Sequence, residues 1–149
     1  MKIFFTKKEY RLLIDMISLS DWVMNSHHLA SEKINADYDV LYQKVLSYAK
    51  EMQAEDIVEY AKNLDGYFPT SKHEENLHDK YIEPYEQDVF WEQLIDCLAQ
   101  RDFLKKVGAE KFKSMDWIER ASATDEIEQE YSMEFENNGI TNLVLQKDT

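Results

Sequence analysis

Residues 7–26 read KKEYRLLIDMISLSDWVMNS, and this stretch decides the fold. Thr6 and Glu9, at its start, have the spacing of a capping box, in which a hydroxyl and a carboxylate satisfy the first free amides of a helix. On helical geometry the apolar side chains cover well over half of the circumference. A surface helix has a narrower apolar stripe, so we expect this helix to be enclosed by other helices on several sides.

We expect specific interactions for three charged residues of this helix. Arg11 and Asp15 are four residues apart and can form an ion pair along the helix. Asp21 falls within the apolar arc. It is either a solvated residue at the rim of the domain or a buried acid with a raised pKa and a partner elsewhere, because an unpartnered buried carboxylate is costly.

The composition indicates one helical domain that spans residues 1–149. The chain has three glycines and two prolines, which allow few turns and favour long helices. Its net charge of −13 repels nucleic acid phosphates and anionic lipids, so we expect neither as a partner. The single cysteine, Cys97, excludes an internal disulfide framework and fits the reducing cytoplasm. No apolar run reaches the roughly 20 residues that span a bilayer.

The rest of the chain predicts a series of shorter helices, divided by caps and breakers. Gly108 and Gly139 are placed to end helices, and Pro84 disfavours helical geometry at the residue before it. The expected helices run to about Met52 after a cap at Asn35 or Asp37, from Glu55 to Leu64, from Lys72 to Ile82, from Val89 to Lys106, from Met115 to Ala121, and from Thr124 to Asn137.

Two short apolar segments have the character of strands. Lys2–Phe5 precedes the first helix, and Asn142–Gln146 follows Gly139. If they pair, they form a small two-stranded sheet from the two termini, which needs helix packing beneath it to be stable. The predicted fold class is therefore mainly α, an irregular multi-helix single domain to which such a sheet can be added.

The helix expected over 89–106 has the clearest division into two faces. Trp91, Leu94 and Cys97 share its apolar sector, so we expect them in the core, with Cys97 as a small unreactive hydrophobe. Trp117 and Ile118 of the next helix are also expected to face inward. The opposite face carries Asp88, Glu92 and Asp96 at four-residue spacing, and this row is expected to be a solvated edge.

The histidines do not have the spacing of metal ligands on a regular helix. His73 and His78 are five residues apart and diverge by about 140°, and His27 and His28 are adjacent. A site assembled between segments, for instance from His28 and Glu32 with His78 and Asp79, stays open as an alternative. The sequence predicts no bound metal and no cofactor.

The stretch 125–136 is the most distinctive candidate site. It holds six carboxylates and neither lysine nor arginine. A helix of this kind attracts basic partners and accelerates their association, or it keeps the protein soluble. The residues expected to face a partner are Asp125, Glu126, Glu128, Glu130 and Glu134. The aromatic stretch from Tyr67 to Tyr85 is a second candidate surface.

These patterns favour a non-catalytic protein-interaction or regulatory module in the cytoplasm. The expected partner is a protein, with a basic surface as one option, and self-association stays open. The alternative is an enzyme, metal-dependent or of another kind, whose site is assembled from histidines and carboxylates between helices.

Overall fold

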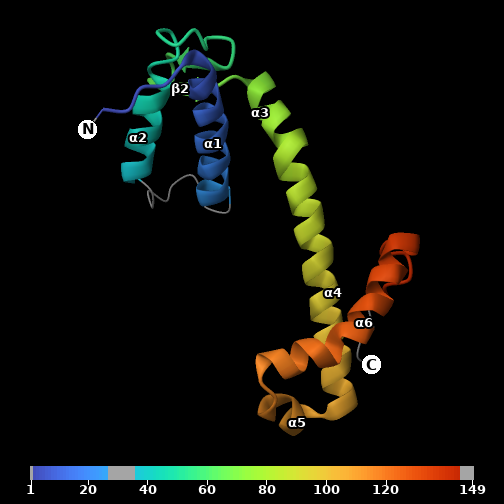
Figure 1. The fold of residues 1–149 in the computed structure, drawn as a ribbon. Helices are drawn as coiled ribbons and strands as arrows, with labels where there is room; N and C mark the ends of the chain where they lie inside the picture. Colours follow the sequence, from blue (N-terminus) through green and yellow to red (C-terminus); the bar gives the residue numbers. More distant parts are fainter. Residues whose placement is uncertain (1, 27–35, 145–149) are drawn as a thin grey trace. The chain divides into compact units, whose positions relative to one another are not determined.

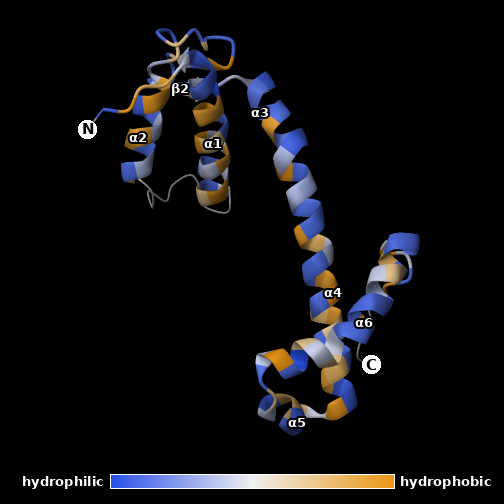
Figure 2. Ribbon diagram, in the orientation of Figure 1, coloured by the Kyte–Doolittle hydropathy of each residue, from blue (hydrophilic) through white to orange (hydrophobic). Residues whose placement is uncertain are grey.

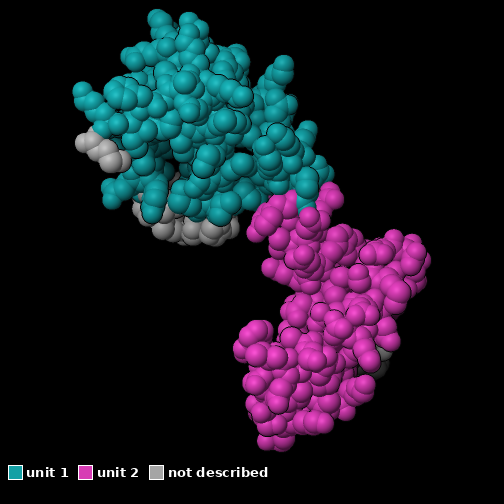
Figure 3. All heavy atoms as spheres, viewed as in Figure 1, with its two compact units in different colours: residues 1–84 teal, residues 85–149 magenta. Residues whose placement is uncertain are grey.

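The structure is a computed structural model that describes residues 2–26 and 36–144. The fold is mainly α with a small antiparallel sheet, which confirms the predicted class. The chain divides into two compact units, residues 1–84 and 85–149 (Figure 3). The prediction of one domain over residues 1–149 stays a prediction.

Unit 1 pairs two helices with a β-hairpin. Figure 1 shows α1 and α2 side by side, with the hairpin at the end of the pair where α1 begins. A short helix and one π-helical turn follow the hairpin. The elements are α1 (Lys7–Asn25), α2 (Ala36–Leu46), β1 (Val58–Ala61), β2 (Gly66–Pro69), α3 (Ser71–Leu77) and the π-helical turn (His78–Ile82).

Helix α1 begins with the predicted capping box. The amide of Glu9 donates to the hydroxyl of Thr6 at 3.2 Å, and the amide of Thr6 donates to the carboxylate of Glu9 at 2.8 Å. The bonds satisfy amides that have no partner within the helix. They also lower the pKa of Glu9, since both its main causes are hydrogen bonds from Thr6.

The core of unit 1 lies between α1, α2 and the hairpin. Ile14 and Leu46 are fully buried, and Tyr10 and Val58 pack in the same cluster. The Tyr10 hydroxyl donates to the carbonyl of Val45 at 2.8 Å. This bond satisfies the one polar atom that the tyrosine brings into the core.

The expectation that α1 is enclosed on several sides is wrong. Hydrophobic residues recur along α1 in Figure 2, but Leu12, Met16 and Val23 are exposed. Within unit 1, the buried residues that α1 contributes to the core cluster are Tyr10 and Ile14, which lie on one side of the helix. The elements of unit 1 that lie beside α1 therefore leave part of its wide apolar surface exposed.

The predicted pairing within α1 is also wrong, because Arg11 reaches across the unit. Its guanidinium donates to the carboxylate of Asp56 at 2.9 Å and to the carbonyl of Gln53 at 2.8 Å. Asp15 instead lies 3.2 Å from the imidazole of His73. Both pairs join α1 to later segments, which periodicity along one helix cannot reveal.

A β-hairpin replaces the helix expected from Glu55 to Leu64, and α2 ends at Leu46 rather than at Met52. Val58 pairs with Pro69 and Tyr60 with Tyr67, whose rings meet edge to face at 5.0 Å. Asp65 has φ of 49°, a left-handed conformation that aspartate tolerates in turns. β-branched and aromatic residues fit the pleated surface on both sides of this turn.

One glutamine fastens the hairpin to α2. The side-chain amide of Gln43 donates to the carbonyl of Tyr67 at 2.8 Å, and its oxygen accepts from the amide of Tyr67 at 2.8 Å. The side chain thus occupies both backbone groups of a strand residue. Gly66 leaves room for it, because a Cβ there would lie 3.1 Å from the Gln43 oxygen.

Pro84 does not end a helix, contrary to the prediction. The π-helical turn at His78–Ile82 leads directly into α4 (Glu83–Val107), and the amide of Glu83 donates to the carbonyl of His78, five residues back. In an α-helix the proline ring would clash with the carbonyl four residues before it. The wider turn immediately before Pro84 relieves that clash.

Unit 2 continues α4 and adds α5 (Ala109–Ser114) and α6 (Trp117–Asn138). Gly108 and Gly139 mark the ends of α4 and α6, as predicted, and both have positive φ. Two expected helices from Met115 to Asn137 are one, because Thr124 does not act as a cap. Its hydroxyl donates to the carbonyl of Ala121 at 3.1 Å inside the continuous helix.

The core of unit 2 is small and aromatic. Leu98, Phe103 and Phe135 are buried, and Trp91 lies 5.4 Å from Phe135 between ring centroids. Trp91 and Leu94 are half-buried, so they border this core. Three other expectations are wrong: Cys97, Trp117 and Ile118 are exposed. Asp88, Glu92 and Asp96 form the expected exposed edge.

The predicted sheet between the termini is wrong. Residues 2–6 and 143–144 form no strand, and residues 145–149 lie outside the described part of the chain. Ile3, Phe4 and Phe5 instead line an apolar cavity of about 420 Å³ together with residues of α1 and α2, among them Leu41 and Val45. None of the helices in the described ranges is both long and apolar enough to cross a lipid bilayer.

Two tyrosines of unit 1 should make its stability fall at alkaline pH. Burial raises the pKa of Tyr10 and of Tyr42 to about 12, from an ordinary value of about 10. Unfolding exposes both phenols, so between pH 10 and pH 12 the unfolded chain releases protons that the folded chain retains. The free energy of unfolding should therefore decrease across this window.

Denaturant unfolding at a series of pH values measures this decrease, and the absorbance of tyrosinate follows the ionisation. Replacing Tyr42 with phenylalanine should make the decrease shallower. A free energy of unfolding that stays constant from pH 10 to pH 12 would contradict the burial of these phenols.

Candidate functional site

Helix α6 places several carboxylates of the acidic stretch 125–136 in a stripe along one face. Asp116 caps its start, accepting from the amide of Glu119 at 2.9 Å, and the carboxylate of Glu119 accepts from the amide of Asp116 at 3.0 Å. Residues four apart lie on one helical face. Glu126, Glu130 and Glu134 therefore lie in a row along α6, two turns in length.

This stripe lines a groove in unit 2. A cavity of about 510 Å³ is bordered by α4 and α6, and α4 adds Asp102 and Lys106 to its lining. Ile127 and Tyr131 also line it. We call this cavity the acidic groove; its lining carboxylates are Asp102, Glu126, Glu130 and Glu134.

Asp102 is held in place by three polar neighbours. Arg101 donates to its two oxygens at 2.8 and 2.9 Å, and the Tyr131 hydroxyl donates to it at 2.5 Å. Lys105 lies 3.6 Å away. The Arg101 hydrogen bonds, and next those from Tyr131, hold the pKa of Asp102 well below its usual range, so this carboxylate is ionised at neutral pH.

The same contact raises the pKa of Tyr131, because its hydrogen bond to Asp102 favours the neutral phenol. A carboxyl group acts as a general acid near neutral pH only if its pKa is raised. A phenol acts as a general base there only if its pKa is lowered. Both shifts run the other way. The chemistry of Asp102 and Tyr131 suits a fixed negative charge beside an aromatic ring.

The structure separates the five residues predicted to face a partner. Glu126, Glu130 and Glu134 line the acidic groove. Asp125 is exposed and accepts from the side chain of Gln129 at 3.0 Å. Glu128 is half-buried, and its carboxylate accepts from the hydroxyl of Thr124 at 2.5 Å. Sequence reasoning missed Asp102, which the packing of α4 beside α6 brings to the stripe.

Unit 1 holds a second cavity, of about 520 Å³, beside α1, α3 and the π-helical turn. Asp21 lies in its lining and accepts from the side-chain amide of Asn25 at 2.8 Å. Burial raises the pKa of Asp21, as expected for a buried acid, but the side chain is half-buried and its partner lies on the same helix rather than elsewhere. The carboxylates of Glu74 and Glu75 and the aromatic rings of Trp22 and Tyr42 also border this cavity.

The two histidines in the described part of the chain have different surroundings. His73 is buried, with its imidazole 3.2 Å from Asp15. His78 is exposed beside Asp79, at 3.5 Å. His27 and His28 lie outside the described residues, as does Glu32, so the site proposed from His28, Glu32, His78 and Asp79 stays a prediction.

Comparisons of the chain with protein-family models, with curated proteins and with solved structures find no match.

Proposed function

We propose that the protein is a non-catalytic interaction module that binds a basic segment of a partner protein in the acidic groove. The observation that carries this proposal is the convergence of three glutamates of α6 with Asp102 of α4 around one cavity. Lys106 is the cation that lines it with them. The groove therefore presents an excess of negative charge over a defined surface.

The apolar residues that line the groove can contact the side chains of lysine and arginine. Both carry an aliphatic stem that packs on apolar surface while the charged end stays among carboxylates. Ile127 offers such a surface, and the ring of Tyr131 can accept a cation over its face. A basic segment thus finds apolar and charged contacts at the spacing of one helical turn.

The net charge of the whole chain supports the same proposal. A charge of −13 attracts a basic partner from a distance and accelerates its encounter with the groove. It repels nucleic acid and anionic membranes, so a basic protein is the partner class that we propose. We place this function in the cytoplasm, because Cys97 is an exposed lone thiol that suits a reducing compartment.

A titration with fluorescent peptides tests the proposal. One peptide is rich in lysine and arginine, and its control has glutamine at every basic position. The full-length protein should bind the basic peptide, with an affinity that falls at least about tenfold from low to physiological salt, because exposed charges are screened beyond about 8 Å. It should not bind the control.

Fluorescence anisotropy reports both affinities. Equal binding of the two peptides would show that charge is not the basis of recognition. No binding of the basic peptide even at low salt would reject the proposed function.

A further inference from the structure

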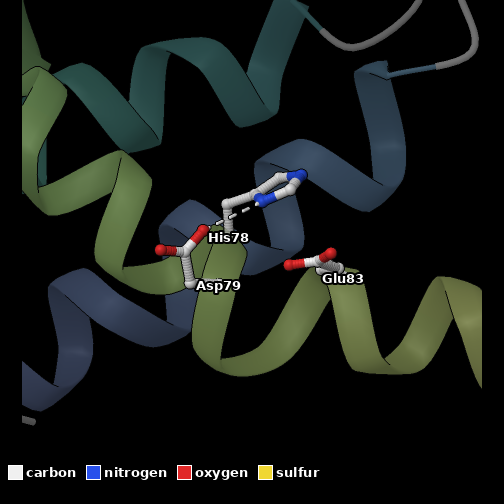
Figure 4. A group of neighbouring side chains, drawn as sticks. All are labelled: His78, Asp79 and Glu83. Atoms are coloured by element: carbon white, nitrogen blue, oxygen red, sulfur yellow. Dashed lines mark ion pairs between the residues drawn. The ribbon is translucent and has the colours of Figure 1, made fainter.

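The π-helical turn of unit 1 gathers three side chains with metal-binding atoms. His78, Asp79 and Glu83 each offer one ligand atom, and these atoms all lie within 4.8 Å of one another. Figure 4 shows His78 and Asp79 on this turn and Glu83 just after it, at the start of α4. We propose that they form a binding site for a divalent transition metal ion of the Zn²⁺ class.

The π-helical turn explains why these residues meet. On an α-helix, the side chains of residues five apart diverge by about 140° and cannot bind the same metal ion. Here the amide of Glu83 donates to the carbonyl of His78, so residues five apart are direct neighbours along the helix. Such turns recur at functional sites. The α-helical divergence of about 140° between residues five apart, which made His73 and His78 poor metal ligands in the sequence, does not apply to His78 and Glu83.

The ligand set has the chemistry of a zinc site with open positions. An imidazole nitrogen and two carboxylate oxygens are ligands that Zn²⁺ accepts, and three protein ligands leave room for water or a small molecule. A tetrahedral site needs its ligand atoms about 3.3 Å apart. His78 and Asp79 have side-chain exposures of 51% and 78%, so both can rotate to close the remaining distance.

The surroundings of the turn favour a cation. Glu74 and Glu75 border the cavity of about 520 Å³ that His78 and Asp79 also line. A metal ion held by the turn would lie at the rim of this cavity, where a ligand in the cavity can reach its open coordination positions.

Titration of the full-length protein with Zn²⁺ by isothermal calorimetry tests the site. The wild type should bind one ion at this site. His78→Ala and Glu83→Gln should each weaken binding at least about tenfold, since each removes one of three ligands. Glu86→Gln, an exposed glutamate outside the cluster on the same helix, should bind as the wild type does. Circular dichroism checks that each variant keeps its helical content.

The double variant His27→Ala, His28→Ala controls for two of the three other histidines, and it should retain the wild-type affinity. Absorption spectra of the Co²⁺-loaded protein give a second readout, because bands from histidine and carboxylate coordination should disappear in His78→Ala. The proposal is overturned if the wild type binds no Zn²⁺, if His78→Ala binds as tightly as the wild type, or if the double variant loses binding.

Discussion

Replacing Leu46 with alanine should lower the free energy of unfolding by about 2–5 kcal/mol. Leu46 ends α2 and is fully buried against Tyr10 and Ile14 of α1. Removing its side chain costs the transfer free energy of the lost methyl and methylene groups and leaves a cavity. Because unit 1 has one small core, little neighbouring structure is available to fill that cavity.

Leu41→Ala, on the same helix, is the matched control. Leu41 is 57% exposed, and a surface substitution should change the free energy of unfolding by about 0.5 kcal/mol or less. Denaturant unfolding measures both variants. Equal effects of the two substitutions would contradict the assignment of the core to the contact between α1 and α2.

Removing three charges from the acidic groove should weaken the binding of a basic peptide at least about tenfold at low salt. The variant is Glu126→Gln, Glu130→Gln, Glu134→Gln. Glutamine matches glutamate in size and helix propensity, so α6 should persist. Its oxygen can still accept the hydrogen bonds that Glu134 receives from Asn138 and Asn142.

The loss should appear mainly in the association rate, because exposed charges steer encounter more than they hold the complex. Stability should stay constant or rise slightly, since like charges four residues apart on a helix repel one another. Stopped-flow measurements at two salt concentrations separate the rates, and the difference between variant and wild type should shrink as salt is added.

A second triple variant separates the groove from general acidity. Glu86→Gln, Glu110→Gln and Asp125→Asn remove an equal number of charges, three, from exposed positions that do not line the groove. This variant should keep most of the wild-type affinity. If both variants lose binding equally, the effect comes from net charge, and the groove is not the binding site.

Features that depend on residues close together along the chain can be predicted from the sequence. The capping box at Thr6 and Glu9 and the end of the last helix at Gly139 are both confirmed. Periodicity does not reveal the hairpin, whose loop, residues 62–65, joins two strands of four residues and has Asp65 in a left-handed conformation. Residues 57–64 fit helical periodicity as well as a strand, because a short apolar run matches both patterns.

Features that depend on packing between elements were beyond sequence reasoning. Periodicity places Glu126, Glu130 and Glu134 on one face of a helix, but it cannot show that Asp102 and Tyr131, 29 residues apart in the chain, share a hydrogen bond. The exposure of Cys97 likewise depends on which part of α4 is covered. The proximity of His78 and Glu83 depends on a π-helical turn, whereas α-helical geometry places residues five apart on different faces.

Mapping a bound basic peptide by ¹H–¹⁵N NMR on the full-length protein tests the proposed function most directly. Chemical shift changes on titration identify the residues that contact the peptide without any substitution. We expect the largest changes at residues 101–106 of α4 and 126–134 of α6, where the acidic groove lies. Changes confined to residues 1–84, or small changes spread evenly over all acidic residues, would contradict binding in the groove.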